Sequence, residues 1–483
     1  MSPRLSDLVR RDLDVDPVIE GVTADSRKVR PGFLFAALPG AKADGRDFIA
    51  AALGAGAAAV LAADDVAGIA APVVRALDVR RAYALAARAF YGAQPQVCVA
   101  VTGTNGKTSV AGFCRQMFDA LGHKAASMGT LGVALSPKAG GEQLTPPGLT
   151  TPDAADVAER LADLAARGVQ RLAMEASSHG LDQRRLDGVR LTAAAFLNLT
   201  QDHLDYHGSM DAYRASKLRL FESLLPRGGT AVLNADSDAY GAFAAAAVTA
   251  GQTVLSVGEA GQGLRLIARI PVPEGQRLVL SAFGEPFEVL LPLAGGFQAA
   301  NALAAAGLCI AAGEAPGAAL AALEGLQGAP GRLQRIGAGP RGGDAYVDYA
   351  HTPDGLSTVL AALRPHTRGR LIVVFGAGGD RDRTKRPLMG AAAAAGADLV
   401  FVTDDNPRSE PPAAIRAAIL AAAPGAREIG DRRAAICAAA AELNDGDVLV
   451  VAGKGHEQGQ IVGAETVPFD DAAEIAAALE LDA

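Results

Sequence analysis

Cysteine is scarce in this sequence of 483 residues, which contains only four, at positions 98, 114, 309 and 437. Disulfide frameworks and thiolate metal sites need cysteines at short paired spacings, and these four lie far apart. We therefore expect the four cysteines to be small buried apolar residues in a protein of a reducing compartment. We expect them to form neither disulfides nor a thiolate metal centre.

Long apolar runs are also lacking. The first residues, Met-Ser-Pro-Arg-Leu-Ser-Asp-Leu, have no apolar core of the kind that a secretory signal needs. The most apolar stretch, from Phe48 to Ala63, consists mostly of Ala and Gly. It falls short of the roughly 20 residues that a membrane helix requires. The expected location is the cytoplasm, without stable membrane insertion.

The sequence has no excess of positive charge. It contains 45 Lys and Arg against 53 Asp and Glu, which gives a formal net charge of −8. A nucleic-acid partner requires a basic face, so none is expected. Any anionic substrate has to be held by a few placed cations and by backbone amide groups.

Lysine is rare even among the basic residues, with eight lysines against 37 arginines. Four of the eight (Lys107, Lys217, Lys385 and Lys454) fall inside the motifs described below. Arginine cannot replace a compact ammonium or a nucleophilic amine, so this distribution weakly favours chemical roles for these lysines.

What is present is the composition of a globular protein, with half of the residues hydrophobic and a fifth charged. The length suggests about three domains, which we place at 1–95, 96–330 and 331–483. Short apolar runs alternate with helical patterns, which predicts an α/β protein with mostly parallel sheets. The expected elements are a strand-like run at 29–38, a helix near 80–91, and strands at 97–101, 169–174, 194–199, 231–234, 345–349, 371–375, 399–403 and 448–451.

The strongest motif is Val-Thr-Gly-Thr-Asn-Gly-Lys-Thr at 101–108, directly after an expected strand and before an expected helix. A Gly-rich turn at a helix N-terminus presents backbone N–H groups to a phosphate. Lys107 would neutralise the β- and γ-phosphates of ATP, and Thr108 would bind Mg²⁺. The first position of the usual phosphate-binding loop holds Val101 instead of Gly, and an ordinary Gly-rich turn is the alternative.

Two further motifs end expected strands of the central segment. Glu175 begins Glu-Ala-Ser-Ser-His-Gly at the carboxyl edge of the sheet, which makes it a candidate Mg²⁺ ligand. The alternative is a nucleophile and base formed by Ser178 and His179, although adjacent residues rarely face each other. The segment 198–208 contains two His and two Asp that could bind metal. From the residues alone, Lys217 is expected to be a solvated helix residue.

The last segment carries four charged motifs, each after an apolar strand: 348–353, 376–386, 404–408 and 453–457. Because parallel strands end at one edge of a sheet, these motifs should lie together. That edge would carry charges of both signs, which suits a zwitterionic substrate.

With these motifs in order, the sequence resembles the Mur ligases of bacterial cell-wall synthesis. The resemblance rests on Asp25-Ser-Arg27, Ala43-Asp-Gly-Arg46, Thr-Gly-Thr-Asn-Gly-Lys-Thr108, Glu-Ala-Ser-Ser-His-Gly180, Asp-His-Leu-Asp-Tyr-His-Gly208, Asp-Tyr-Ala-His351 and Gly-Lys-Gly-His-Glu457. It implies a first domain that binds a UDP-linked substrate, a central P-loop-type ATPase and a Rossmann-like C-terminal domain that binds an amino acid. It also implies an ATP-dependent ligase that activates a carboxylate as an acyl phosphate.

The resemblance assigns roles to individual residues. Those expected at the UDP-MurNAc-L-Ala-D-Glu substrate are Ser26, Ala41, Lys42, Ala43, Thr150, Thr151, Ser177, Gln183 and Arg185. Those expected at ATP are Gly103, Thr104, Asn105, Gly106, Lys107, Thr108, Ser109, Asn301, Arg332, Asp348 and His351. Those expected at meso-diaminopimelate are Arg381, Asp405, Asn406, Pro407, Arg408, Gly453 and Glu457, with Arg408 gripping the distal carboxylate that lysine lacks.

The implied catalytic residues are Lys107, Glu175, His203 and Lys217. Thr108 and Glu175 would hold one Mg²⁺ ion. His203 would hold a second, together with Lys217 as a carbamate, which replaces the solvated role expected from the residues alone. The expected partners are small-molecule substrates bound to a monomer. One alternative is a ligase of the same architecture that uses L-lysine or another acceptor; a folylpolyglutamate synthetase would be such a ligase. The other alternative is a P-loop NTPase that is not a ligase.

Overall fold

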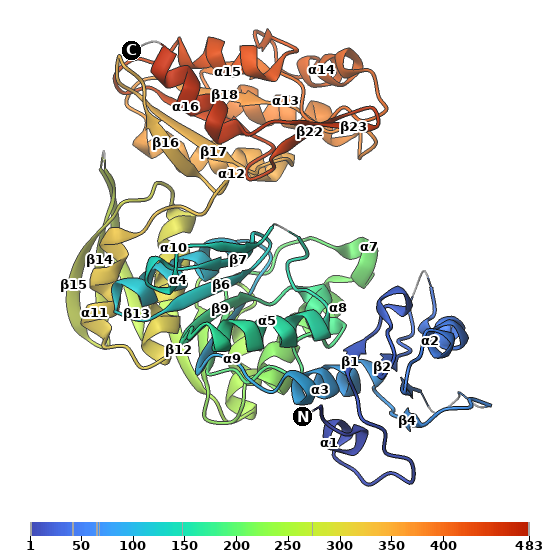
Figure 1. Cartoon of the computed structure of the whole chain (residues 1–483). Coiled ribbons are helices and arrows are strands. Elements are labelled where there is room, and N and C mark those ends of the chain that lie inside the picture. The colour runs from blue at the N-terminus through green and yellow to red at the C-terminus, as the bar shows by residue number, and fades with distance from the viewer. Residues whose placement is uncertain are drawn as a thin grey trace. The chain divides into compact units, whose positions relative to one another are not determined.

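The computed structural model describes residues 2–40, 43–63, 66, 68–146, 148–272 and 274–481. The chain divides into two compact units. The first contains Met1–Arg265 and Leu303–Ala319, and the second contains Leu266–Ala302 and Leu320–Ala483. Figure 1 shows the course of the chain through both.

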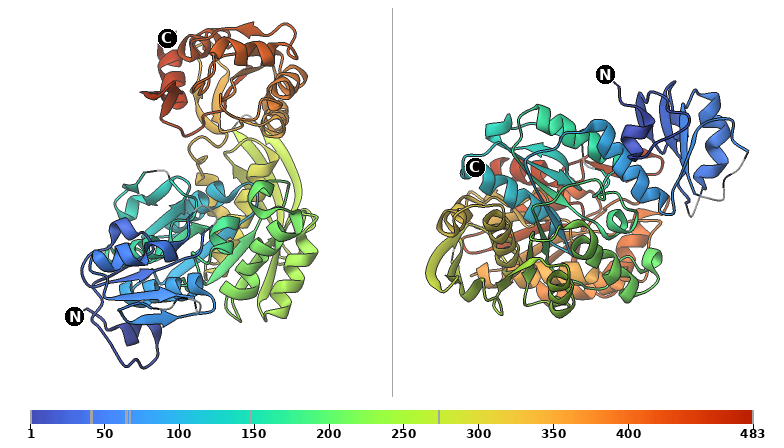
Figure 2. Two further views of the ribbon diagram at one scale, coloured as in Figure 1. Left: turned by 90° about the vertical axis from the view of Figure 1, so that its right-hand side faces the viewer. Right: turned by 90° about the horizontal axis from the view of Figure 1, so that it is seen from below.

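The first unit opens with a small α/β layer structure. Its elements are α1 (Leu5–Val9), β1 (Gly21–Thr23), the 3₁₀ helices η1 (Ser26–Lys28) and η2 (Gly45–Phe48), β2 (Phe33–Ala36), α2 (Ile49–Gly54), β3 (Ala59–Ala62), β4 (Val73–Arg75) and α3 (Val79–Tyr91). The four strands pair in parallel in chain order. Apolar side chains of α1 and α3 pack on one face of this sheet and those of α2 on the other. Figure 2 shows the course of these elements, in blue, in two further views.

A larger sheet fills the rest of the first unit. Its elements are β5 (Val97–Thr102), α4 (Lys107–Ala120), β6 (Ala125–Gly129), β7 (Gly132–Leu135), η3 (Pro137–Ala139), β8 (Gln143–Thr145), α5 (Ala154–Ala166), β9 (Arg171–Glu175), α6 (Ser178–Asp182), β10 (Ala193–Phe196), α7 (Leu204–His207), α8 (Met210–Arg219), the π-helical turn η4 (Leu220–Leu224), β11 (Thr230–Asn234), α9 (Tyr240–Thr249) and β12 (Thr253–Gly258). Within this unit the strand order is β12-β11-β10-β5-β9-β6-β7-β8.

The central strand of this sheet is β5, which lies in parallel register between β9 and β10. Every residue of β5 is buried. This explains why its apolar residues do not alternate with polar ones, because the strand is covered on both faces. The sequence predicted β5, β9, β10 and β11 with boundaries shifted by a few residues. It did not predict the short strands β6, β7 and β8, which carry Gly and polar residues. β6 is parallel to β9, and β7 is antiparallel to both β6 and β8.

The elements from 264 to 325 in the chain belong partly to each unit. They are β13 (Leu264–Val272), β14 (Gly275–Ala282), β15 (Glu285–Leu291), α10 (Gly296–Ala311), α11 (Pro316–Ala321) and η5 (Ala322–Gly325). Strands β14 and β15 form an antiparallel pair in the second unit. The sequence patterns did not predict these strands, because all of the expected strands belonged to parallel α/β units.

The rest of the second unit is a three-layer α/β structure. Its elements are β16 (Gln334–Ala338), β17 (Asp344–Asp348), α12 (Pro353–Leu363), η6 (Arg364–His366), β18 (Leu371–Phe375), α13 (Lys385–Gly396), β19 (Leu399–Val402), α14 (Pro412–Leu420), β20 (Arg427–Glu428), α15 (Arg432–Ala440), β21 (Val448–Ala452), β22 (Gly459–Val462), β23 (Glu465–Pro468) and α16 (Asp471–Leu481). The sheet order is β16-β17-β21-β18-β19-β20, and only β16 is antiparallel to its neighbour.

Alternate residues of these strands face two separate cores. Leu371, Val373 and Phe375 of β18 pack with α12, α13 and α14, whereas Ile372 and Val374 pack with α15 and α16. Strands β17, β18, β19 and β21 end at the same edge of the sheet, as the four charged motifs predicted. The α/β fold, with a mostly parallel central sheet and a Rossmann-like C-terminal part, is confirmed.

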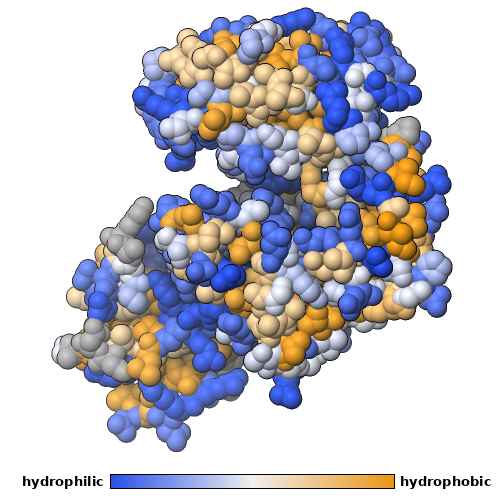
Figure 3. Space-filling view, turned by 180° about the vertical axis from the view of Figure 1, so that it is seen from behind, coloured by the Kyte–Doolittle hydropathy of each residue, from blue (hydrophilic) through white to orange (hydrophobic). Residues whose placement is uncertain are grey.

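Three of the four cysteines are buried and Cys437 is partly exposed; all four are free thiols. Among the described residues, no helix is long and apolar enough to cross a membrane. The face shown in Figure 3 carries mainly hydrophilic residues, with apolar residues in smaller groups.

Candidate active site

The phosphate-binding motif has the expected form, a strand, a tight turn and a helix. It leaves β5 after Thr102 and enters α4 at Lys107. Gly106 has a φ of 89°, a left-handed conformation that favours glycine. Asn198, in the segment that follows β10, braces the turn because its side chain accepts from the Asn105 N–H at 2.9 Å and donates to the Asn105 carbonyl at 3.2 Å.

Two lysine side chains share one carbonyl oxygen in this turn. Lys107 Nζ donates to the Gly103 carbonyl at 2.7 Å and to the Thr104 carbonyl at 2.8 Å. Lys217 Nζ donates to the same Gly103 carbonyl at 2.8 Å. Lys217 is 1% exposed and lies 4.3 Å from the centre of the Tyr213 ring. The expectation of a solvated Lys217 is therefore wrong, because the fold places α8 against the turn.

The surroundings of Lys217 disfavour its charged form. Burial, followed by the nearby charge of Lys107, lowers its pKa well below the ordinary value, and Asp202 opposes this only in part. Among the described residues, no carboxylate forms an ion pair with Lys217. The geometry and the charges around the amine thus favour its neutral form over the ammonium form.

Glu175 ends β9 as predicted and points its carboxylate at the start of α4. Oε2 accepts from the hydroxyl of Thr108 at 3.1 Å, and Oε1 accepts from the backbone N–H of Thr130 at 2.8 Å. The Thr130 hydroxyl lies 2.9 Å from that of Thr150. Glu175 is buried, so these polar contacts compensate for the hydration it has lost. Sequence reasoning missed Thr130, which follows β6 and has no motif around it.

A cluster of imidazole and phenol rings lies next to this end of the sheet. The ring of His179 is 4.9 Å from that of His203, 4.1 Å from that of Tyr206 and 5.4 Å from that of His207. His203 adopts a left-handed backbone conformation with a φ of 53° and is partly exposed. His179 faces these rings and Ser178 is buried, so the geometry gives no support to a nucleophile and base formed by Ser178 and His179.

The two His and two Asp of segment 198–208 were expected to be able to bind metal. Among the described residues, no group of three or more His, Cys, Asp or Glu side chains is arranged to hold a metal ion. A site with fewer ligands from this segment stays a prediction. The set of Thr108, Glu175, His203 and carbamylated Lys217 includes a hydroxyl and a modified lysine and stays a prediction.

The residues expected to line the path of the muramoyl dipeptide form one hydrogen-bonded group. Thr151 Oγ1 donates to the Glu175 carbonyl and accepts from the backbone N–H and the hydroxyl of Ser177, at 3.0 Å in each case. Arg185 donates to the Thr151 carbonyl at 2.5 Å and to Gln183 Oε1 at 2.7 Å. Gln183 in turn donates to the hydroxyl of Tyr206 at 3.0 Å.

The residues expected at the UDP part lie around the first small sheet. Ser26 begins η1, and Ala43 precedes η2. Ala41 and Lys42 lie outside the described residues. A cavity of about 730 Å³ near Ser26 is lined by parts of β1, η1, α3 and the start of α5.

The remaining residues expected at ATP are in the second unit, apart from Ser109, which is buried in α4. Asn301 is a buried residue of α10. Arg332 stacks on the Tyr349 ring at 4.4 Å, and the side chain of His351 contacts the Tyr349 carbonyl at 2.8 Å. Burial raises the pKa of Asp348 to about 6, although its carboxylate accepts from two backbone N–H groups.

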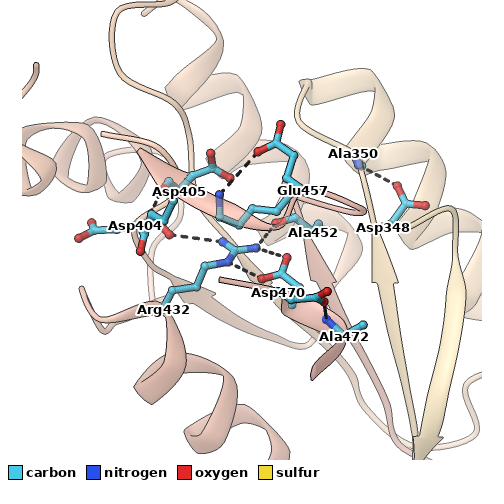
Figure 4. A network of polar contacts seen from close by, with 12 residues as sticks. Asp348, Ala350, Asp404, Asp405, Arg432, Ala452, Glu457, Asp470 and Ala472 are labelled. Carbon is cyan, nitrogen blue, oxygen red and sulfur yellow. Dashed lines mark hydrogen bonds and ion pairs between the residues drawn. The ribbon is translucent and has the colours of Figure 1, made fainter. Parts of the chain in front are cut away.

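The residues expected at the amino acid gather where β18, β19 and β21 end. Arg408 has a φ of 52° and donates to the Gly379 carbonyl at 2.8 Å, and it forms no ion pair with a described carboxylate. Arg381 is exposed. Gly453 has a φ of 120°, and a Cβ there would lie 2.8 Å from Asp405 Oδ2. Figure 4 shows Asp405 and Glu457 on the same side of the buried Arg432.

The buried polar residues at this edge form two pairs, Asn406 with Lys454 and Arg432 with Asp471. Asn406 donates from Nδ2 to Glu457 Oε2 at 3.0 Å and accepts at Oδ1 from Lys454 Nζ at 2.9 Å. Arg432 pairs with Asp471 through two contacts of 2.7 Å, and Pro407 is buried beside Asn406. Sequence reasoning placed Lys454 in a motif without giving it a role, and the rarity of lysine was the only signal.

Together the fold and these sites define a class of protein: an α/β protein with a Gly-rich turn of the phosphate-binding type in one unit and a cluster of charged residues of both signs in the other. Three family models match the chain, described as "Mur ligase family, catalytic domain" at 18–91, "Mur ligase middle domain" at 101–309 and "Mur ligase, glutamate ligase domain" at 331–455.

Individual relatives match from end to end. The UDP-N-acetylmuramoyl-L-alanyl-D-glutamate--2,6-diaminopimelate ligase of Caulobacter vibrioides is 70% identical over 99% of each chain. The protein of the same name from Bradyrhizobium diazoefficiens is 52% identical, again over 99% of each chain. A solved structure of a protein with this name superimposes with a TM-score of 0.76 at 34% identity, covering 100% of this chain and 99% of the other.

The chain belongs to the Mur ligase family. The resemblance stated from the motifs is confirmed, and so is the prediction of an ATP-dependent enzyme of the acid–amino-acid ligase class. The residue assignments and the domain boundaries at 95 and 330 stay predictions.

Proposed function

We propose that this enzyme adds meso-diaminopimelate to UDP-MurNAc-L-Ala-D-Glu through an acyl phosphate, in the synthesis of peptidoglycan precursors. Relatives 70% and 52% identical carry the name of this ligase. The structural observation that carries the acceptor assignment is the pair of opposite charges around Asn406. Arg408 has no carboxylate partner among the described residues, and Glu457 Oε2 is held by Asn406.

In the first unit, the turn from Gly103 to Ser109 would receive the phosphates of ATP. Backbone N–H groups at the start of α4 favour anionic oxygens, and Lys107 lies over the turn as a compact cation. The terminal carboxylate of UDP-MurNAc-L-Ala-D-Glu attacks the γ-phosphorus, and ADP leaves. Lys107 stabilises the charge that develops on the transferred phosphoryl group.

The residues near the turn fit Mg²⁺. Thr108 and Glu175 offer a hydroxyl and a carboxylate oxygen 3.1 Å apart, and both are hard oxygen ligands. His203 and Lys217, the latter as a carbamate, would hold a second ion. Bound Mg²⁺ would neutralise phosphate charge. Lys217 supports this proposal because it is buried beside Lys107 with a lowered pKa, and only a neutral amine adds carbon dioxide.

In the second unit, the amino acid would be oriented by charges of both signs. Arg408 would pair with the distal carboxylate of diaminopimelate through its guanidinium, and Glu457 would receive an ammonium group. The free amine then attacks the acyl carbon, which forms the amide bond and releases phosphate. L-Lysine lacks the distal carboxylate and would leave Arg408 without a partner, so it should be rejected.

Phosphate release tests the proposal, measured with ATP, Mg²⁺, UDP-MurNAc-L-Ala-D-Glu and a panel of amino acids. We expect release to require both the muramoyl dipeptide and an amino acid, with diaminopimelate preferred over L-lysine by about a hundredfold or more. Equal rates with the two amino acids would contradict the acceptor assignment. Release without any amino acid would favour a P-loop NTPase that is not a ligase.

Removal of Mg²⁺ with a chelator should abolish release, and unchanged turnover would contradict the metal assignment. The proposal also includes a cytoplasmic location and a monomeric state. Light scattering during size-exclusion chromatography measures the oligomeric state.

A further inference from the structure

We propose that Lys454 is a positioning residue for the amino-acid acceptor, which fixes Glu457 and Arg408 through the side chain of Asn406. The proposal rests on the proposed function and deepens it, because it names a residue that sets acceptor affinity and selectivity without touching the acceptor.

Unlike most lysines, Lys454 is fully buried. It is 0% exposed, so its ammonium group has given up hydration and needs polar partners within the protein. Nζ donates to Asn406 Oδ1 at 2.9 Å and to the Gly459 carbonyl at 2.7 Å, and it lies 3.6 Å from Glu457 Oε2. Asp405, Glu457 and Asp471 favour its charged form and Arg432 opposes it. These contacts join the segment after β21 to the segment after β19.

The Lys454 ammonium group, together with the Ile461 N–H, decides which way the Asn406 amide points. An ammonium only donates, so the amide atom that faces Lys454 must be the oxygen. Oδ1 also accepts from the Ile461 N–H at 2.9 Å. The amide nitrogen therefore has to face Glu457, where it donates to Oε2 at 3.0 Å. Lys454 thus fixes Oε2 of Glu457 through two successive hydrogen bonds, from Lys454 to Asn406 and from Asn406 to Glu457. The other carboxylate oxygen, Oε1, is left for an ammonium group of the acceptor.

The same contacts also position Arg408. Lys454 and Asn406 hold Gly459 and Ile461 of β22. The Arg408 N–H donates to the Ile461 carbonyl at 3.1 Å, and the Gly463 N–H donates to the Arg408 carbonyl at 2.8 Å. Arg408 is therefore clamped on the strand that Lys454 anchors. Both charged ends of the acceptor site depend on one buried ammonium group.

The experiment compares steady-state kinetics of the full-length enzyme and its Lys454→Met variant, which keeps the length of the side chain and removes its donors. We expect the KM for diaminopimelate to rise about tenfold or more while kcat falls less than about threefold. The KM values for ATP and UDP-MurNAc-L-Ala-D-Glu should stay unchanged. The preference for diaminopimelate over L-lysine should fall. Lys138→Met, at a half-exposed lysine of the first unit, is the matched control.

Two further variants separate positioning from a general structural role. Lys454→Gln keeps one N–H donor toward Asn406 and should restore part of the acceptor affinity. If Lys454 acts through Asn406, the double variant Lys454→Met with Asn406→Leu should have the same KM for diaminopimelate as Asn406→Leu alone. Multiplied effects in the double variant would overturn the proposal. An unchanged KM for diaminopimelate in Lys454→Met, or an equal change in all three KM values, would also overturn it.

If Lys454→Met does not fold, a variant that keeps the buried lysine can still test the proposal. Asn406→Asp retains an acceptor for Lys454 and removes the donor to Glu457, so it should raise the KM for diaminopimelate about as much; a wild-type KM would overturn the proposal. If the wild-type enzyme prefers another amino acid, the proposed function is wrong. The same variants then test Lys454 through the KM for that amino acid.

Discussion

Two buried lysines, one in each compact unit, lie in opposite electrostatic surroundings. Lys217 is 1% exposed and shares the Gly103 carbonyl with the cation of Lys107. Lys454 is 0% exposed and lies near the carboxylates of Asp405 and Glu457. Burial lowers the pKa of both, but the next largest influence lowers it further at Lys217 and raises it at Lys454.

The difference teaches that burial alone does not give a lysine its role. The charges that the fold brings beside the amine add to the effect of burial on its pKa, as at Lys217, or oppose that effect, as at Lys454. The first situation suits covalent modification and metal binding, and the second suits a fixed hydrogen-bond donor. Changes around Lys217 should therefore affect phosphoryl transfer, and changes around Lys454 should affect the acceptor.

The largest effect is expected from Lys107→Ala. It removes the cation over the phosphate-binding turn, so turnover should fall by about 10²–10³-fold while the protein stays folded. Phosphate release and trapping of the acyl phosphate with hydroxylamine measure this. Lys138→Ala is the control, and near-normal turnover of Lys107→Ala would contradict the ATP site.

Lys217→Ala should reduce turnover by about a hundredfold, because it removes the carbamate that would hold a second metal ion. Added short carboxylates should restore part of the activity by supplying an anion in the vacated space. The same carboxylates should not rescue a Lys454 variant, which lacks a donor and not an anion. If carboxylates rescue both the Lys217 and the Lys454 variants, or neither of them, the contrast between the two lysines is contradicted. A crystal structure shows the carbamate directly, since it is labile in acid.

Arg408→Ala should reduce the preference for diaminopimelate over L-lysine by about tenfold to a hundredfold, because the distal carboxylate loses its partner. Single-turnover formation of the acyl phosphate should change little, which would assign this region to the acceptor. Arg433→Ala, at an exposed arginine paired with Glu474, is the control. An unchanged ratio of kcat/KM values for the two amino acids would contradict the role of Arg408.

The smallest effect concerns His456, between the two charged residues of the acceptor motif. Burial and then Arg332 lower its pKa from 6.5 to about 4. The unfolded chain therefore binds a proton more readily, and the contribution of His456 to stability is present above pH 6.5 and is lost as pH falls toward 4. We expect a loss of about 1 kcal/mol, after allowance for partial solvent screening.

Urea denaturation at pH 7 and pH 4.5 measures that loss, and His456→Gln should remove this part of the pH dependence. An identical pH dependence in the wild type and the variant would show that other groups cause it.

Much of the fold was predictable because its signals are local. The strands β5, β9, β10, β11, β17, β18, β19 and β21 are apolar runs, most of them followed by polar motifs. These parallel strands and the residues at their carboxyl ends could therefore be predicted. Strands β6 to β8 and β12 to β15 were missed, since their patterns are weak and their partners are set by tertiary packing. The same limit hid Thr130, which follows β6 and reaches Glu175 at the end of β9.

The sequence by itself determined the family, the order of the motifs and the kinds of charge that each sheet edge carries, because these depend on residue types at fixed spacings. Only the tertiary structure decided what each lysine can do. The Gly103 carbonyl and Lys217 are 114 residues apart in the chain and 2.8 Å apart in space. Burial and neighbouring charges act through space, so the pKa of a side chain is set by packing that no local pattern records.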